Sequence, residues 1–231
     1  MSRRRTAECA PAGRTFVVAH RSGNSLAEAR AVERLGVPAI EADVHLFRGR
    51  LELRHLKTAG PLPLLWDRWT LANPFARRLL LAELLPSVGL ATELVLDLKG
   101  WRARLSARVA EALVPRVAAG GATTVCSRSW RLLEPFRVIR GIRVVHSVGS
   151  ERQLARLRRR FSGAGLEGVS IHERLVDADT ARDLRAMTGT ILAWPVNTTA
   201  RARELAALGV TGLITDRPGD LPAVAAVTGA P

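Results

Sequence analysis

The sequence predicts a single α/β domain folded as a closed (β/α)8 barrel of the TIM type, slightly irregular around its second and third strands. Short runs of β-branched and apolar residues alternate with longer amphipathic stretches, which is typical of a parallel sheet. The repeating unit of about twenty-odd residues recurs about eight times, which favours a closed barrel over an open doubly wound sheet. The chain has 231 residues, 47% of them hydrophobic, which is enough to bury the core of one such domain.

Strand-like segments number nine, one more than an eight-stranded barrel needs. The six residues HLFRGR between the second and third segments are too few for a crossover helix, so we expect a hairpin-like excursion there that could leave out a barrel helix. Residues 58–78 have little clear periodicity and are expected to form a long functional loop. The expected strands are residues 16–20, 38–44, 51–55, 93–99, 123–127, 142–147, 168–172, 190–194 and 212–216, with amphipathic helices such as 25–36, 102–120, 177–187 and 199–209 between them.

The N-terminus predicts a flexible basic tail over residues 1–14, followed by one barrel domain over residues 15–231. Its charged start lacks the apolar stretch of a signal peptide, and no apolar run is long enough for a transmembrane segment. Cys9 and Cys126 provide neither a disulfide framework nor zinc-ligand spacing. We therefore expect a cytoplasmic protein.

The formal charge of +14 first suggests an anionic partner, but its distribution argues against nucleic acid. Arginines are scattered along the chain, and no aromatic residues alternate with them for base stacking. Only Lys57 and Lys99 are lysines, which indicates positions where a compact ammonium is needed. Nothing in the sequence fixes an oligomeric state.

Polar side chains gather at the carboxyl ends of the first four expected strands, where a parallel barrel places its active site. Side chains two apart on a strand share a face, so the paired charges on the second and fourth strands should point the same way. Each group alone could be structural, for example a carboxylate paired with a nearby arginine. These residues are His20, Arg21, Glu41, Asp43, His55, Asp97 and Lys99.

Taken together, these groups indicate metal-assisted chemistry on a phosphate. Glu41, Asp43 and Asp97 form an oxygen-rich set that suits Mg²⁺ or Ca²⁺. Two flanking imidazoles are suited to serve as an acid and a base, and two neighbouring cations are suited to bind an anion. Trp194 and Asn197 could line the mouth of the barrel, although Trp194 could equally be a packed residue at its top.

The same residues resemble the motifs of the glycerophosphodiester phosphodiesterase family, over about residues 16–221. The resemblance implies a TIM-type barrel in lipid metabolism that hydrolyses glycerophosphodiesters, with the help of a metal, to sn-glycerol 3-phosphate and an alcohol. The segment His20-Arg21-Ser22 resembles the opening HRG of the family, and residues 31–44 resemble the segment around its first two metal ligands. His55 matches the second catalytic histidine, and Leu96-Asp97-Leu98-Lys99 matches the strand of the third ligand. The C-terminal motifs are matched by Trp194-Pro195-Val196-Asn197 and by residues 209–218.

Carried over by position, the resemblance assigns a role to each of the gathered residues. Glu41, Asp43 and Asp97 would bind the metal. The general acid and base would be His20 and His55, and the phosphate would be bound by Arg21 and Lys99.

Departures from the family pattern leave two alternatives open. Ser22 replaces a glycine, the loop through Ser25 lacks an expected glutamate, Asp97 replaces a glutamate, and Leu56 replaces an aspartate. The Asp-Leu-Lys strand also occurs in the sphingomyelinase D group, so a phospholipid headgroup is one alternative substrate. A catalytically silent barrel that binds phosphodiesters is the other. The segment at residues 209–218 favours the glycerophosphodiester reading.

Overall fold

The computed structural model of the protein describes residues 15–58, 65–67, 70–72, 77–162 and 165–221. The expected tail at residues 1–14 lies outside the described part of the chain, as do the last ten positions of the expected barrel domain, residues 222–231.

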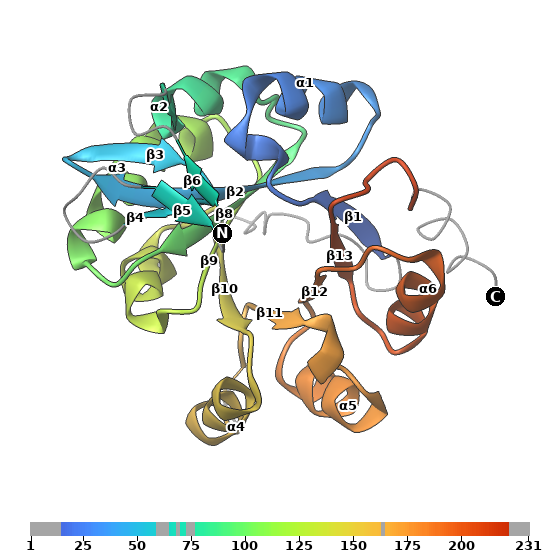
Figure 1. The fold of residues 1–231 in the computed structure, drawn as a ribbon. Coiled ribbons are helices and arrows are strands. Elements are labelled where there is room, and N and C mark those ends of the chain that lie inside the picture. The colour runs from blue at the N-terminus through green and yellow to red at the C-terminus, as the bar shows by residue number, and fades with distance from the viewer. Residues whose placement is uncertain (1–14, 59–64, 68–69, 73–76, 163–164, 222–231) are drawn as a thin grey trace, which may run out of the picture.

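Eight parallel strands form a closed ring, which confirms the predicted barrel (Figure 1). The ring closes because the first strand pairs with both the last strand and the second. The barrel strands are β1 (Phe16–Ala19), β2 (Ala39–Phe47), β8 (Glu93–Lys99), β9 (Thr123–Ser127), β10 (Ile142–Val148), β11 (Gly168–His172), β12 (Ile191–Trp194) and β13 (Gly212–Thr215).

The extra strand-like segment is the third along the chain, and it lies outside the ring, as the short connection before it predicts. It forms β3 (Arg50–Leu53), which runs antiparallel to the end of β2 and pairs in turn with β7 (Leu79–Leu80). Part of the segment expected to be a long loop is instead a small antiparallel sheet of β4 (Lys57–Thr58), β5 (Leu65–Asp67) and β6 (Thr70–Ala72).

Helices surround the ring, with two irregular connections. Among the described residues between β2 and β8, the helical segments are the four-residue α2 (Leu81–Leu84) and the 3-10 turn η2 (Leu85–Ser87), and neither is a full barrel helix. Between β9 and β10 it forms the 3-10 segment η3 (Trp130–Val138), which contains Pro135. The other helical segments are η1 (Ser22–Asn24), α1 (Leu26–Arg34), α3 (Ala103–Ala118), α4 (Glu151–Arg160), η4 (Glu173–Leu175), α5 (Ala178–Met187) and α6 (Thr199–Ala207).

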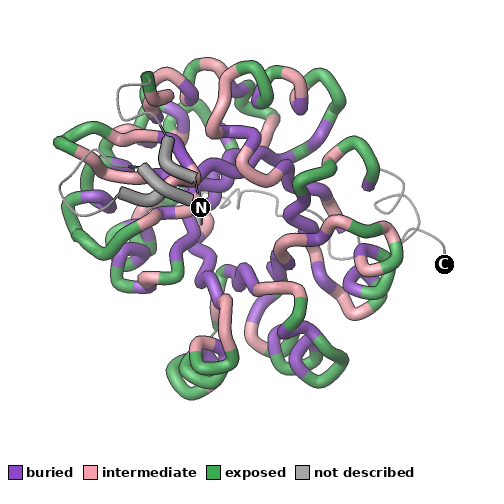
Figure 2. Tube along the Cα trace, in the orientation of Figure 1, coloured by how far each residue is buried: buried purple, intermediate pink, exposed green. Residues whose placement is uncertain are grey.

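The barrel strands are buried along most of their length, because the barrel interior covers one face and the helices cover the other. Figure 2 shows the buried residues in purple along the ring and on the inner sides of the helices. A large apolar cluster fills the space between the strands and the helices. A smaller one contains Val18, Val95, Cys126 and Ile214 from four barrel strands. Because Asp97 and Lys99 follow Val95 at intervals of two on β8, their side chains emerge on the same face as this smaller cluster. No helix in the described part of the chain is long and apolar enough to cross a membrane.

Candidate active site

A cavity of about 1810 Å³ opens at the carboxyl ends of the barrel strands. This is the end at which a parallel barrel builds its active site. Most of the predicted site residues line it: His20, Arg21, Glu41, Asp43, His55, Asp97, Lys99 and Trp194. Asn197 is not among the lining residues and lies behind His20, as described below.

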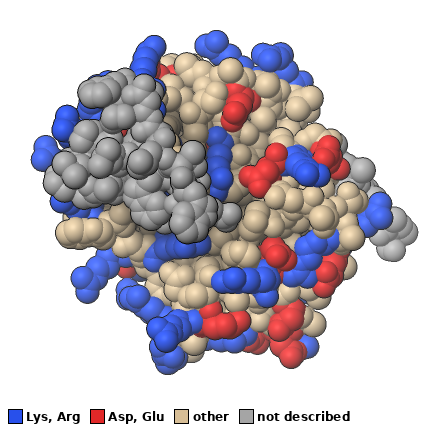
Figure 3. Space-filling view, in the orientation of Figure 1, with Lys and Arg blue, Asp and Glu red and all other residues tan. Residues whose placement is uncertain are grey.

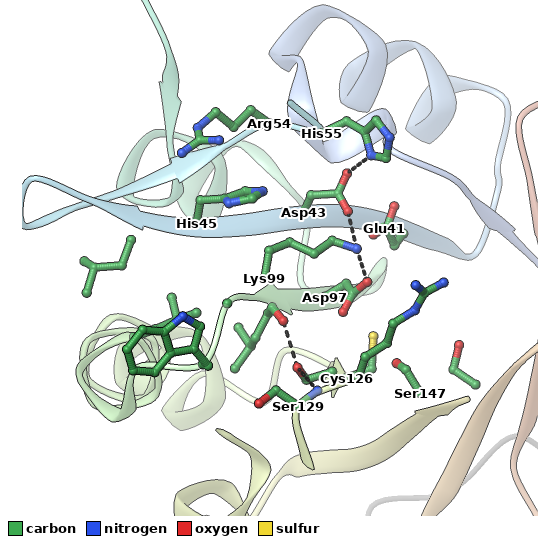
Figure 4. Close-up of a pocket in the computed structure, with 18 of the residues that line it drawn as sticks. Glu41, Asp43, His45, Arg54, His55, Asp97, Lys99, Cys126, Ser129 and Ser147 are labelled. Carbon is green, nitrogen blue, oxygen red and sulfur yellow. Dashed lines mark hydrogen bonds and ion pairs between the residues drawn. The ribbon is translucent and has the colours of Figure 1, made fainter. Parts of the chain in front are cut away.

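Three carboxylates converge on the inner side of β2 and β8. The register of the two strands sets Asp43 opposite Asp97, and Glu41 precedes Asp43 by two residues on the same face. Glu41, Asp43 and Asp97 each offer an oxygen within 4.8 Å of the others (Figure 4). All three side chains are buried or nearly so, and Oδ1 of Asp97 has no hydrogen-bond partner among the described residues.

Lys99 lies between two of these carboxylates. Its Nζ is 2.8 Å from Oδ1 of Asp43 and also contacts Oδ2 of Asp97. Burial alone would lower the pKa of Lys99, but the charges of Asp97, Asp43 and Glu41 outweigh burial and raise it. Lys99 is therefore a permanent cation at the centre of the site.

The three acids respond differently to this environment. Burial and the nearby charge of Asp43 raise the pKa of Glu41 well above its usual value. Burial also raises the pKa of Asp97, despite the opposing charge of Lys99. At Asp43 burial acts in the same direction, but the hydrogen bond with His55 and the charge of Lys99 outweigh it and lower the pKa. Asp43 is thus the firmly ionised member of the cluster.

The short loop after β1 holds two of the carboxylates in place. The backbone N–H of Arg21, a residue with φ of 59°, donates to Oε2 of Glu41 at 2.7 Å. Gly23 lets the loop lie directly against β2, because a Cβ there would be only 2.7 Å from Cβ of Ala42. This close approach brings the next residue of the loop to the carboxylate of Asp43.

Asn24 is a functional residue that sequence reasoning did not single out. Its Nδ2 donates to Oδ2 of Asp43 at 3.1 Å, and its Oδ1 accepts from the backbone N–H of Asp43 at 2.9 Å. This pair of bonds fixes the orientation of the carboxylate. The available signal was the pair Asn24-Ser25 in the loop after the His20-Arg21-Ser22 motif, since Ser25 caps α1 and thereby sets the position of Asn24.

His20 is oriented by a chain of hydrogen bonds from the segments that follow β13, the neighbour of β1 in the ring, and β12. Its Nδ1 lies 2.7 Å from Oδ1 of Asp216. Asn197 donates through Nδ2 to Oδ2 of the same carboxylate at 2.8 Å, and its own Oδ1 accepts from the hydroxyl of Thr215 and the backbone N–H of Asp216. Burial and the charge of Arg21 lower the pKa of His20, so its ring is neutral at pH 7.

His55 reaches the site through the hairpin rather than from the end of a barrel strand. Because β3 runs antiparallel to β2, the chain returns to the level of Asp43, where the backbone N–H of Arg54 donates to the Asp43 carbonyl at 3.1 Å. Nδ1 of His55 is then 3.3 Å from Oδ2 of Asp43. The side chain stays 34% exposed, facing the cavity.

The wall opposite the carboxylates is aromatic and basic. The ring of Trp194 packs edge to face on His172, with 4.9 Å between centroids. The guanidinium of Arg128 lies over the Trp194 ring at 4.9 Å. Arg128 was also not singled out from the sequence, although its place just after the strand ending at Ser127 marks it as a residue of the barrel mouth.

The donor set fits a hard divalent cation. All three candidate ligands are carboxylates, they are close enough to share one ion, and one buried oxygen of Asp97 lacks a partner among the described residues. Asp97 is one methylene shorter than the glutamate of the family pattern, and its Oδ2 is engaged by Lys99. Mg²⁺ and Ca²⁺ both accept such oxygen donors.

Comparison with solved structures places the chain among proteins of this fold. A candidate glycerophosphoryl diester phosphodiesterase from Silicibacter pomeroyi DSS-3 superposes with a TM-score of 0.76 at 18% identity, over 94% of this chain and 95% of that one. A glycerophosphodiester phosphodiesterase from Parabacteroides distasonis ATCC 8503 gives 0.72 at 19% identity, over 95% and 100% of the two chains. An Oleispira antarctica phosphodiesterase, solved in complex with sn-glycerol-3-phosphate, gives 0.72 at 18% identity, over 91% and 96%. No family model and no curated protein matches the sequence. At these identities the similarity establishes the fold, a TIM barrel shared with structures of this phosphodiesterase family.

Proposed function

We propose that the protein is a metal-dependent phosphodiester hydrolase that cleaves glycerophosphodiesters to sn-glycerol 3-phosphate and an alcohol. The observation behind this proposal is the pair of imidazoles beside the carboxylate cluster. Nδ1 of His20 and of His55 each contacts a carboxylate, which orients both rings at the cavity, and imidazoles so placed are suited to proton exchange. Two structural neighbours support the choice of substrate: one is named as a glycerophosphodiester phosphodiesterase, and the other is a phosphodiesterase in complex with sn-glycerol-3-phosphate.

Glu41, Asp43 and Asp97 would hold a divalent cation, Mg²⁺ or Ca²⁺. When bound, such an ion neutralises charge on the oxygens of a phosphate. Asn24 keeps the carboxylate of Asp43 aimed into the cluster. Lys99 and Arg21 add positive charge on the cavity side, where they would bind the phosphate oxygens of the substrate.

Proton transfer falls to the two histidines. Asp216 accepts from Nδ1–H of His20, so the neutral ring presents an unprotonated Nε2 that can take a proton from the attacking hydroxyl. That hydroxyl belongs either to water or to the neighbouring carbon of the glycerol. The more exposed His55, beside the ionised Asp43, would donate a proton to the departing alcohol oxygen.

The test is release of glycerol 3-phosphate from a panel of glycerophosphodiesters in Mg²⁺, in Ca²⁺ and in chelator. Release should require the metal, and Glu41→Gln should reduce it at least about a hundredfold, because the buried ligand is lost. Glu28→Gln makes the same chemical change on the exposed side of α1 and should leave release unchanged.

Other outcomes would favour the alternatives. Metal-dependent cleavage of lysophospholipids or sphingomyelin alone would indicate a phospholipid headgroup substrate. Tight binding of diesters without turnover would indicate a catalytically silent barrel, and release that persists in chelator and in Glu41→Gln would contradict the metal site. The cytoplasmic location is a prediction that cell fractionation can test.

A further inference from the structure

The cavity extends beyond the carboxylate cluster into a strongly basic region. Arg102 follows β8, Arg128 follows β9, Arg131 lies in η3 and Arg156 lies in α4, and all four line the cavity. We call these four residues the arginine sector. None of them has a carboxylate partner among the described residues, and Figure 3 shows basic side chains beside the grey atoms at the centre of this face.

Three of these four guanidinium groups lie over aromatic rings. Arg156 lies over the ring of Trp130 at 4.9 Å, and Trp130 is itself fixed by a 3.0 Å hydrogen bond from Nε1 to the carbonyl of Ser147. Arg102 similarly lies over the ring of Trp101 at 5.5 Å. Stacking on a ring face leaves the N–H groups at the edge of a guanidinium available to bind an anion.

The two ends of the cavity differ in charge. The only carboxylates among the described residues that line it are those of the candidate metal site, whereas the arginine sector adds cations alone. In the proposed function, Arg21, Lys99 and a bound metal would together bind the phosphate of the diester. That phosphate would therefore leave the arginine sector without a ligand. The cavity of about 1810 Å³ also exceeds the roughly 300–1,000 Å³ of ordinary small-molecule sites, which leaves room for a bulky alcohol.

We propose that the arginine sector binds a second phosphate on the alcohol of the substrate, so that the preferred substrate is a glycerophosphodiester whose alcohol is itself phosphorylated. This inference rests on the proposed hydrolase function. The sector lines the same cavity as the reaction site, which favours a second group of the same molecule over the flat surface of a membrane. Arg128 connects the arginine sector with the carboxylate cluster, because its guanidinium lies over Trp194 and its charge acts on Asp97.

The test compares two substrates that differ by one phosphate, glycerophosphoinositol and glycerophosphoinositol 4-phosphate. The wild type should prefer the phosphorylated substrate in kcat/KM by about tenfold, which corresponds to ~1.4 kcal/mol. The double variant Arg131→Gln/Arg156→Gln should bring that ratio close to one. Arg152→Gln is the matched control, because Arg152 is exposed on the same helix, α4, but does not line the cavity. Circular dichroism verifies that each variant is folded.

The possible results separate this inference from the function on which it rests. A wild-type ratio near one, with both substrates cleaved, overturns the inference alone. If neither substrate is cleaved, the proposed function fails, and calorimetric titration with inositol 1,4-bisphosphate decides the binding site. Binding that the double variant loses and Arg152→Gln keeps supports the arginine sector, whereas no binding overturns it. The double variant could instead lose binding to phosphatidylglycerol vesicles while its kcat/KM ratio between the two substrates stays that of the wild type. This result would assign the arginine sector to a membrane surface and would also overturn the inference.

Discussion

Replacing Asp216 with asparagine tests the orientation of His20 without removing the histidine. Asn197 has its Oδ1 occupied by the hydroxyl of Thr215 and the backbone N–H of Asp216, so its Nδ2 must donate toward the side chain at position 216. In Asp216→Asn, the new amide would therefore turn its oxygen toward Asn197 and its NH2 toward Nδ1 of His20. Nδ1 would become an acceptor, and the proton would move to Nε2. The ring could then no longer accept a proton from the attacking hydroxyl.

The structure also sets the size of the effect. General base catalysis is worth about 10²–10⁴ in rate, and the same substitution at a buried triad aspartate of serine proteases costs about 10⁴. The side chain of Asp216 is 47% exposed, so water can partly replace its interaction with His20. We therefore expect the lower end of this range, a loss of about a hundredfold in kcat/KM, or ~2.7 kcal/mol of transition-state stabilisation.

The assay measures kcat/KM for glycerol 3-phosphate release across pH, together with ¹⁵N NMR of the His20 ring to identify its protonated nitrogen. Asp220→Asn makes the same chemical change at an exposed position on the same segment and should have no effect. Wild-type kcat/KM in Asp216→Asn, or a ring that still carries its proton on Nδ1, would refute the reasoning.

Three further predictions concern the supports of the site and of the fold. Asn24→Ala removes both hydrogen bonds to Asp43 and should weaken divalent-cation affinity about tenfold by titration calorimetry; unchanged affinity would show that the carboxylate needs no support. Arg116→Met on α3 removes the donors to four backbone carbonyls and should lower the free energy of unfolding in urea by about 3 kcal/mol; a loss below about 1 kcal/mol would mean that water replaces them. His146 packs on two aromatic rings, and burial and the charge of Arg137 lower its pKa from 6.5 to about 4. Between these two pH values the unfolded chain binds the proton and the folded protein does not, so the free energy of unfolding should fall as the pH drops from 6.5 to 4. His146→Phe should remove up to about 3 kcal/mol of that decline, and an unchanged slope of stability against pH would contradict this assignment.

The barrel and its carboxylate cluster were predictable because both depend on local periodicity. A period of two places Glu41 with Asp43, and Asp97 with Lys99, on common faces whatever the details of packing. Parallel neighbours then bring their carboxyl ends to one edge, which is where β2 and β8 set Asp43 opposite Asp97. The excess of one strand-like segment and the short second connection likewise predicted the excursion at β3.

The supports of the catalytic groups were not predictable, because they depend on distant parts of the chain. Asn197 and Asp216 reach His20 only when the ring closes through β1 and β13, and the sequence offered Asn197 only as a pocket residue. The contact of Asn24 with Asp43 depends on the close approach permitted at Gly23. Nothing in the sequence distinguishes Arg128 from the other arginines of the chain, and its contact with Trp194 forms only in the folded barrel.

Lys99 gives the cluster a built-in counter-ion. If all three carboxylates ionise when a cation binds, they and the one ammonium leave two negative charges, which a single divalent cation would neutralise. The ammonium limits the repulsion that the three acids would otherwise exert on one another. Because Glu41, Asp43 and Asp97 lie on the paired strands β2 and β8, the three candidate ligands are held together by the barrel itself.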